Sequence, residues 1–205
     1  MPRVTKSYKK ELRQRILRAA YSEFCKKGYD KTNLDDVAKA LGIARGTIYL
    51  YFRSKREILN AISTTSLARL SRILKRQDWT SGDIASTTRA FYRETKSGLP
   101  KGSEKMDIEM MAESTRNSGL KKHRLAENRR MQQIIVNFIE SQFGKQISTK
   151  NERKKEIKEV VVGAMALYYG MEMLQIQGYT NQEIEDSWAR TLALIIEGAT
   201  TNSKV

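Results

Sequence analysis

The sequence is short of proline, cysteine, histidine and long apolar runs, and each shortage excludes a class of protein. Among 205 residues, two are proline and one, Cys25, is cysteine. No disulfide can therefore form within the chain, and no cysteine-rich zinc site can be built. No run approaches the roughly 20 apolar residues of a membrane-spanning helix, and the first ten residues lack the apolar stretch of a signal peptide. We therefore expect a cytoplasmic protein.

The scarcity of catalytic residue types argues against an enzyme. His123 is the single histidine, and it stands in the basic run Lys121-Lys122-His123-Arg124, where neighbouring cations disfavour its protonated form. Cys25 has no histidine near it in the sequence, so a Cys–His nucleophile is not expected. The sequence also has no phosphate-binding glycine loop and no run of metal ligands. We expect neither a catalytic site nor a metal or cofactor.

Positive charge is in excess and is concentrated near the N-terminus. The formal net charge is +15, and residues 1–60 hold fifteen Lys or Arg against six Asp or Glu. The remaining 145 residues hold 23 and 17, so under a third of the chain carries most of the excess. Such a segment suits a polyanion, with DNA the first candidate. A basic surface that serves only solubility would have the same composition.

The spacing of apolar residues predicts an all-α fold, because they recur three and four residues apart almost throughout. We expect helices over residues 8–27, 34–40, 45–52, 54–76, 82–97, 104–117, 121–143, 152–177 and 181–198. The first three form an N-terminal helix-turn-helix domain, residues 1–54. The other six form a C-terminal ligand-binding and dimerisation body, residues 55–205.

The second and third helices have the pattern of a helix-turn-helix. Gly42 permits the left-handed turn between them. In the third helix Ile48 and Phe52 lie four residues apart and can face inward. Gly46 costs roughly 1 kcal/mol inside a helix relative to alanine, which favours a backbone that must approach another surface closely. The side chains left for the outer face are Arg45, Thr47, Tyr49 and Tyr51.

The N-terminal segment resembles the tetracycline-repressor (TetR) family over about 45 residues without a gap. The resemblance departs from the family at Ala44, where a capping serine is usual, and at Asn33, which replaces the usual threonine or serine and can still cap. The residues that carry it are Ile16, Leu17, Ala19, Ala20, Phe24, Gly28, Tyr29, Thr32, Asp36, Val37, Ala38, Leu41, Gly42, Ile43, Gly46, Thr47, Ile48, Tyr49, Tyr51, Phe52, Ser54, Lys55 and Leu59.

The resemblance implies a double-stranded DNA site with two related half-sites, read by a homodimer. Arg45 and Thr47 become the expected base readers, since arginine matches the paired acceptors of guanine, and Gly46 allows close approach. The expected phosphate contacts are Thr32, Tyr49, Tyr51 and Lys55. The N-terminal arm, with Arg3, Lys6, Lys9 and Lys10, is expected to reach an adjacent minor groove or the backbone. Core packing by the tyrosines and simple solvation of the lysines are the alternatives.

In the family, the last two long helices of each subunit form the dimer interface, so the resemblance implies the same here. Small and aromatic side chains along both helices suit close helix packing. The same side chains could equally fill the core of their own chain. The expected interface residues are Val161, Ala164, Tyr168, Met171, Trp188, Thr191 and Ile195.

Methionines are frequent in the body and suit an adaptable apolar cavity, although they are also ordinary core residues. The expected cavity residues are Met110, Met111, Phe138, Met165 and Tyr169. Beside them lies a basic cluster that includes Lys121, Arg129 and Arg130. An apolar cavity near exposed cations suits an amphipathic anion, and several TetR-like regulators of lipid metabolism have such a combination. A long-chain acyl-CoA is therefore the first candidate effector.

Together these features predict a transcriptional regulator of fatty-acid metabolism that binds DNA as a repressor and is released by its effector. The alternative is an architectural DNA-binding protein that responds to no effector. Both would neutralise phosphates, so salt dependence does not separate them, whereas the ratio of operator to random-DNA affinity does.

Overall fold

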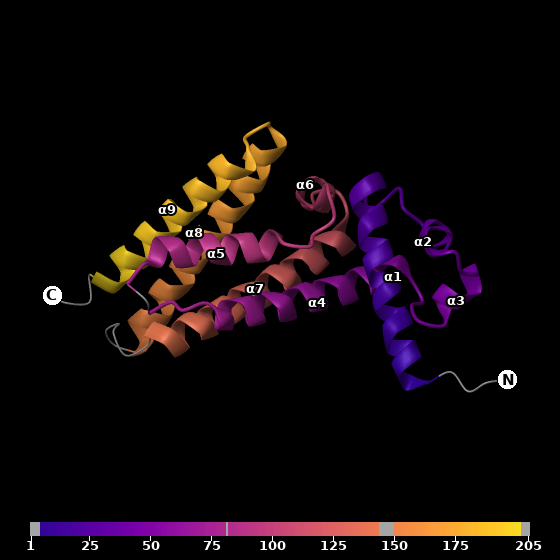
Figure 1. The fold of residues 1–205 in the computed structure, drawn as a ribbon, viewed down its shortest axis with the longest axis horizontal. Helices are drawn as coiled ribbons and strands as arrows, with labels where there is room; N and C mark the ends of the chain where they lie inside the picture. The colour runs from indigo at the N-terminus through magenta and orange to yellow at the C-terminus, as the bar shows by residue number, and fades with distance from the viewer. Residues whose placement is uncertain (1–4, 81, 144–149, 202–205) are drawn as a thin grey trace. The chain divides into compact units, whose positions relative to one another are not determined.

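The computed structural model describes residues 5–80, 82–143 and 150–201, and all secondary structure in these residues is helical. This confirms the predicted all-α class. In chain order the helices are α1 (Lys6–Lys27), α2 (Leu34–Leu41), α3 (Arg45–Tyr49), α4 (Lys55–Arg76), α5 (Ile84–Lys96), α6 (Ser103–Ser114), α7 (Ser118–Phe143), α8 (Lys150–Ile176) and α9 (Asn181–Thr201) (Figure 1).

The chain divides into two compact units. The first extends to Ser66 and takes in residues 99–120; the second comprises residues 67–98 and the chain from Lys121 onward. The first unit thus continues past Ser54 into α4 and also includes α6. The spacing of apolar residues identifies a helix but not the helices that it packs against. From the sequence, α6 was therefore expected in the C-terminal body.

Local signals in the sequence fix where α1 and α2 begin and end. The Thr5 hydroxyl accepts a hydrogen bond from the amide of Tyr8 at 3.2 Å and caps α1. At the start of α2, the amide of Asp36 donates to the Asn33 side chain and the Asp36 carboxylate accepts from the Asn33 amide, both at 2.9 Å. This reciprocal capping box satisfies amides that a helix start otherwise leaves without partners.

The turn between α2 and α3 is a left-handed glycine turn. Gly42 has φ 63°, and its amide donates to the carbonyl of Lys39 at 3.1 Å. The next amide, that of Ile43, donates to the carbonyl of Ala38 at 3.1 Å. These bonds satisfy the last carbonyls of α2 while reversing the chain, so α3 begins directly afterwards.

The third helix is shorter than expected. It ends at Tyr49 rather than Phe52, because the amides of Tyr51 and Phe52 both donate to the carbonyl of Ile48 at 2.9 Å. A carbonyl shared in this way tightens the last turn. Ile48 and Phe52 are both fully buried, which confirms that this pair faces inward.

A capping box of shifted form starts α4. The amide of Glu57 donates to the Ser54 hydroxyl at 3.2 Å, and the Glu57 carboxylate accepts from the amide of Arg53 at 2.7 Å. The return bond therefore reaches the residue before the cap. The link between α3 and α4 is held by two hydrogen bonds within five residues.

The first unit has one continuous core, in which α6 packs closely on α1. Ile16, Phe24 and Ile58 are at most 1% exposed, and burying such a side chain contributes about 1.5–3 kcal/mol. The Cys25 sulfur lies 3.9 Å from the Met106 sulfur.

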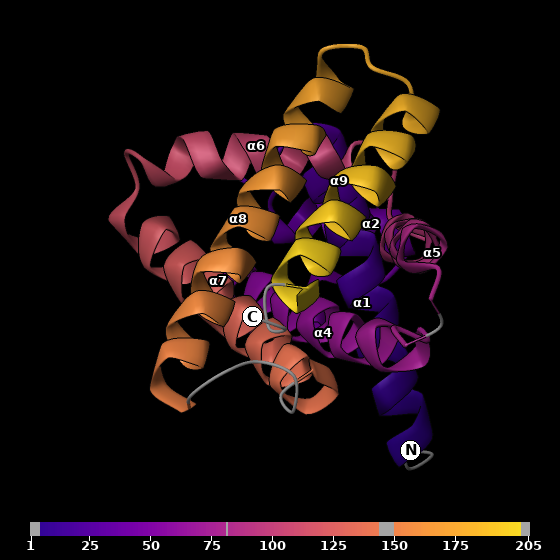
Figure 2. The ribbon, with the colours of Figure 1, turned by 90° about the vertical axis from the view of Figure 1, so that its left-hand side faces the viewer.

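The second unit is built around α5, α8 and α9, and Figure 2 shows α8 and α9 running side by side. Its core is aromatic: the ring of Trp79 lies 5.6 Å from those of Phe91 and Phe138, both edge-on. A buried hydrogen bond of 2.9 Å from the Thr88 hydroxyl to the carbonyl of Ala189 joins α5 to α9.

Candidate functional site

The outer face of α3 is exposed and carries the residues predicted to read DNA. Arg45, Gly46 and Tyr49 are exposed, whereas Thr47 is half-buried. A methyl group added at Gly46 would have no atom of the chain within 4 Å. The protein's own packing therefore does not require a glycine there, and the flat surface is available to an approaching partner.

Arg45 is held in place by two neighbours. Its guanidinium contacts the Asp35 carboxylate at 2.9 Å and donates a second bond to it at 3.1 Å. It also donates to the Tyr49 hydroxyl at 3.1 Å. The Tyr49 bond and the Asp35 charge both raise the pKa of Arg45, so the side chain stays charged. A base contact by Arg45 must share or replace the contact with Asp35.

Thr32 and Lys55, both predicted phosphate contacts, are bound to the chain's own backbone. Thr32 is 2% exposed, and its hydroxyl donates to the carbonyls of Gly28 at 2.8 Å and Glu23 at 3.2 Å. The Lys55 ammonium donates to the carbonyl of Tyr29 at 2.6 Å.

Burial lowers the pKa of Lys55, and its ammonium lies 4.4 Å from the centre of the Tyr29 ring. The structure therefore gives both Thr32 and Lys55 a role in holding the loop between α1 and α2. Phosphate contact by either side chain stays a prediction.

The remaining predicted DNA contacts are spread around α3 and the start of α1. Tyr51 is half-buried against the core of the first unit, and Lys6 is exposed in the first turn of α1. Arg3 lies outside the described residues. Two residues beside this face were missed: Asp35, which is half-buried, and Leu50, which is 82% exposed at the end of α3. Leu50 lies between the buried Ile48 and Phe52, so helical spacing alone could have identified it as an outward residue.

The predicted cavity residues belong to different units. Met110 is buried in the core of the first unit, where Met111 is half-buried. Phe138 belongs to the aromatic core of the second unit, where Met165 packs against a separate small core. Tyr169 donates from its hydroxyl to the Asn128 side chain at 2.9 Å. The predicted cations of α7 are all exposed: Lys121, Arg129 and Arg130.

The predicted dimer residues lie on the inner face of α8 and α9. Val161, Met171 and Trp188 are at most 6% exposed and fill cores of their own unit. Neighbouring apolar side chains are instead exposed: Val162 at 55% and Leu194 at 61%. The other predicted interface residues are half-buried: Ala164, Tyr168, Thr191 and Ile195.

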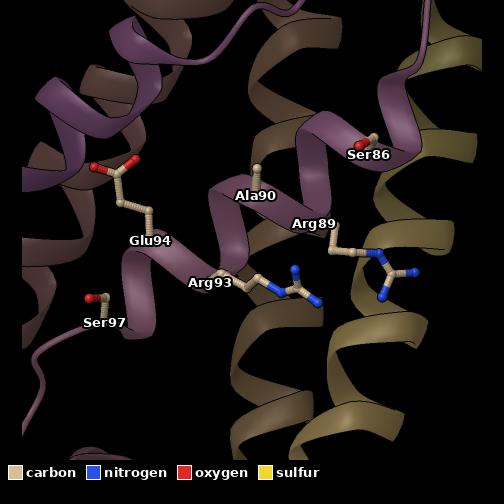
Figure 3. Close-up of a pocket in the computed structure, with 6 residues that line it drawn as sticks. All are labelled: Ser86, Arg89, Ala90, Arg93, Glu94 and Ser97. Carbon is tan, nitrogen blue, oxygen red and sulfur yellow. The ribbon is translucent and has the colours of Figure 1, made fainter.

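A hollow of about 460 Å³ lies on α5, and Figure 3 shows the side chains that line it. Two of these, Arg89 and Arg93, contact the Glu185 carboxylate of α9 at 3.0 and 2.7 Å. Arg93 first, and then Arg89, lower the pKa of Glu185. The two arginines at this hollow are therefore already paired, and their ion pairs join α5 to α9.

Nucleophilic or metal chemistry finds little support in the described residues. Burial raises the pKa of the Cys25 thiol to about 12, with Asp107 and Glu104 adding to the effect, so the thiol stays protonated. Within residues 5–80, 82–143 and 150–201 no group of three or more His, Cys, Asp or Glu could hold a metal ion. In the same ranges no helix combines the length and the apolar character needed to cross a membrane.

Residues 16–62 match the family model described as "Bacterial regulatory proteins, tetR family". This segment is similar to the N-terminal domain of the TetR family. The match covers α1 from residue 16 onward, all of α2 and α3, and the start of α4, including the exposed face of α3. The model describes regulatory proteins rather than enzymes.

Among curated proteins, the chain is 41% identical over 66 residues to the HTH-type transcriptional regulator YfiR of Bacillus subtilis. The match covers 32% of each chain, so less than half of the relative is matched. The sequence likeness to this relative thus spans about a third of either chain.

Solved structures extend the likeness to the whole fold. Salmonella enterica GusR is 22% identical, with a TM-score of 0.69 over 96% of this chain and 98% of that one. A transcriptional regulator from Saccharomonospora viridis in complex with choline is 21% identical, with a TM-score of 0.63 over 92% and 96%. The helical body after the N-terminal domain therefore shares the fold of these two proteins.

Proposed function

We propose that the protein is a transcriptional repressor that binds a two-fold symmetric DNA site as a homodimer and is released by a small-molecule effector. The observation that carries the proposal is the outer face of α3, where Arg45, Gly46 and Tyr49 are exposed on a TetR-type domain. Arginine is the side chain best suited to guanine in the major groove, and the surrounding excess of cations suits the phosphates.

Arg45 and Thr47 read bases, whereas Lys6 and Tyr49 contact the backbone. Arg45 carries most of the sequence preference because Asp35 and Tyr49 orient its guanidinium before DNA arrives. A side chain oriented in advance loses less conformational entropy on binding.

The dimer uses the outer apolar face of α8 and α9. Val161, Met171 and Trp188 fill the core of their own chain, so the contact shifts by one residue to the neighbouring exposed side chains. Val162, Met173 and Leu194 are between 49% and 61% exposed, and Gly163 and Gly170 let a partner helix approach closely. A two-fold contact between equivalent faces would present two equivalent copies of α3.

The effector binds in the second unit and lowers DNA affinity through α4, which runs from the first unit into the second. Arg69 on α4 donates to the carbonyl of Thr95 at the end of α5 at 3.2 Å, so a shift of α5 is passed to α4. By linkage, DNA must weaken effector binding by the same factor.

Two effector classes have support. Exposed Lys121, Arg129 and Arg130 on α7 favour a long-chain acyl-CoA, the ligand of a regulator of fatty-acid metabolism. One regulator of the same fold holds choline, so an organic cation is the second class. Longer acyl chains should release DNA at lower concentration, because each buried methylene adds roughly 0.8 kcal/mol.

Selection from a random DNA pool tests the proposal. The purified protein should enrich a sequence with two related half-sites about 10 base pairs apart or a multiple of that. Enrichment of no common sequence would instead support an architectural protein that binds DNA without preference.

A further inference from the structure

The second unit pairs the ammonium group of a half-buried lysine with a buried carboxylate. Lys96, the last residue of α5, forms an ion pair with Glu172 of α8. Glu172 is 2% exposed, whereas the Lys96 side chain is 20% exposed. The carboxylate is thus deep in the helix packing, and the ammonium reaches it along a stem that begins near the surface.

Aromatic rings surround this ammonium. The Lys96 nitrogen lies 5.2 Å from the centre of the Tyr168 ring and 5.8 Å from that of Tyr92. The Trp188 ring lies 6.0 Å from the Tyr168 ring and 5.8 Å from the Tyr92 ring. Two tyrosine faces and a carboxylate therefore converge on one positive charge, and a tryptophan backs both tyrosines.

The tryptophan also carries a buried polar atom without a partner. Trp188 is only 4% exposed, and its indole nitrogen has no hydrogen-bond acceptor among the described residues. A buried donor left unsatisfied opposes folding. This is a second observation, separate from the ion pair, that stability alone does not account for.

Such an arrangement is poorly explained as a device for stability. The desolvation of two charges offsets most of their attraction, and well-packed apolar side chains of similar volume are often at least as stable. Electron-rich rings together with a carboxylate are, by contrast, the chemistry that recognises ammonium groups.

We propose that Lys96 occupies a binding site for an organic cation, and that the ammonium group of the effector replaces that of Lys96 on Glu172 between Tyr92 and Tyr168. The inference rests on the proposed function, because it names the effector class of the second unit. It selects the organic cation over the acyl-CoA.

Lys96 is well placed to leave. It ends α5 and is followed by Ser97 and by Gly98, which has φ 69°, and its long flexible stem can carry the ammonium into water. Glu172 lies within α8 and has no such freedom. The incoming cation therefore meets a fixed carboxylate and fixed rings, while the protein's own cation moves out.

Departure of Lys96 would act on α4. The guanidinium of Arg69 on α4 donates to the carbonyls of Glu94, Thr95 and Ser97, which flank Lys96 on both sides. A change in the backbone at the end of α5 therefore alters the hydrogen bonds that hold α4. This connects the cation site to the helix that leads to the DNA-binding domain.

The experiment compares choline with its neutral isostere, 3,3-dimethylbutan-1-ol, on the full chain by isothermal titration calorimetry. Choline should bind, and the neutral alcohol should bind at least about tenfold more weakly, because only the cation gains from the rings and the carboxylate. Lys96→Ala should raise choline affinity by at least about tenfold, since the competing ammonium is gone. Glu172→Gln should abolish binding.

The outcomes are distinct. An ion pair that serves only stability predicts no choline binding by either the unchanged protein or Lys96→Ala, and that result overturns the inference. Equal binding of the neutral alcohol also overturns it, as does DNA release by acyl-CoA with none by choline. Where Glu172→Gln fails to fold, Tyr168→Leu serves in its place, because it keeps the ion pair and should still weaken choline at least about tenfold.

DNA binding is measured in parallel. Selective operator binding without a choline effect leaves the proposed function intact and removes the cation site. Choline binding without selective DNA binding does the reverse.

Discussion

Replacing Thr32 by valine separates a structural role from a DNA contact. Valine keeps the shape of threonine but removes the hydroxyl that donates to the carbonyls of Gly28 and Glu23. Each lost hydrogen bond costs about 0.5–1.5 kcal/mol. The 3.2 Å bond is the weaker of the two, so we expect a loss of about 1–2 kcal/mol in the free energy of unfolding.

That loss corresponds to a melting temperature lower by about 2–8 °C for a chain of this size. Differential scanning calorimetry measures it, and Thr32→Ser, which keeps the hydroxyl, is the matched control. DNA affinity, measured by fluorescence anisotropy well below the melting temperature, should not change in Thr32→Val. An unchanged melting temperature together with weaker binding to all DNA would refute the structural role and support a phosphate contact.

Three further substitutions test other parts of the site. Gly46→Ala should stabilise the protein by up to about 1 kcal/mol, since nothing lies within 4 Å of the added methyl, yet it should weaken operator binding in an electrophoretic shift assay. Asp35→Asn should raise the affinity for random DNA and steepen the salt dependence of that affinity by about one unit. Glu156→Gln on α8 is the control for the change in net charge, and an unchanged salt slope in Asp35→Asn would contradict the prediction. Val162→Asp should yield monomers in light scattering, whereas Leu125→Asp, at an exposed apolar residue of α7, should leave the dimer intact. If both variants are dimers, the interface does not include Val162.

The sequence was a good guide wherever a local rule decides the structure. The Asn33–Asp36 capping box and the left-handed Gly42 follow from hydrogen bonds and backbone freedom within a few residues, so residue type and spacing suffice. The inward pair Ile48 and Phe52 follows from helical periodicity. The family match rests on the same segment.

The sequence was a poor guide wherever tertiary packing decides. Thr32 and Lys55 are residue types that usually lie at the surface, and only the fold shows that the backbone near Gly28 and Tyr29 takes their hydrogen bonds. The long-range pair of Lys96 and Glu172 has no sequence signal, because their positions are 76 residues apart.

The buried face of α8 could not be predicted from the sequence for a related reason. From residue 160 to its end the helix is apolar on nearly every side, beginning with three consecutive valines at positions 160–162. When a helix is apolar on every side, the spacing of its apolar residues does not distinguish the inner face from the outer face. The structure resolves the choice by burying Val161 completely and leaving Val162 at 55% exposed.

The central claim is that α3 reads sequence through Arg45. The most direct test measures the affinity of the protein and of Arg45→Ala for a selected operator and for random DNA at one salt concentration, with Lys6→Ala as a second variant. We predict that Arg45→Ala lowers the ratio of operator to random affinity by about 10- to 100-fold, whereas Lys6→Ala weakens binding to both DNAs equally. An unchanged ratio of operator to random affinity in Arg45→Ala would contradict the account.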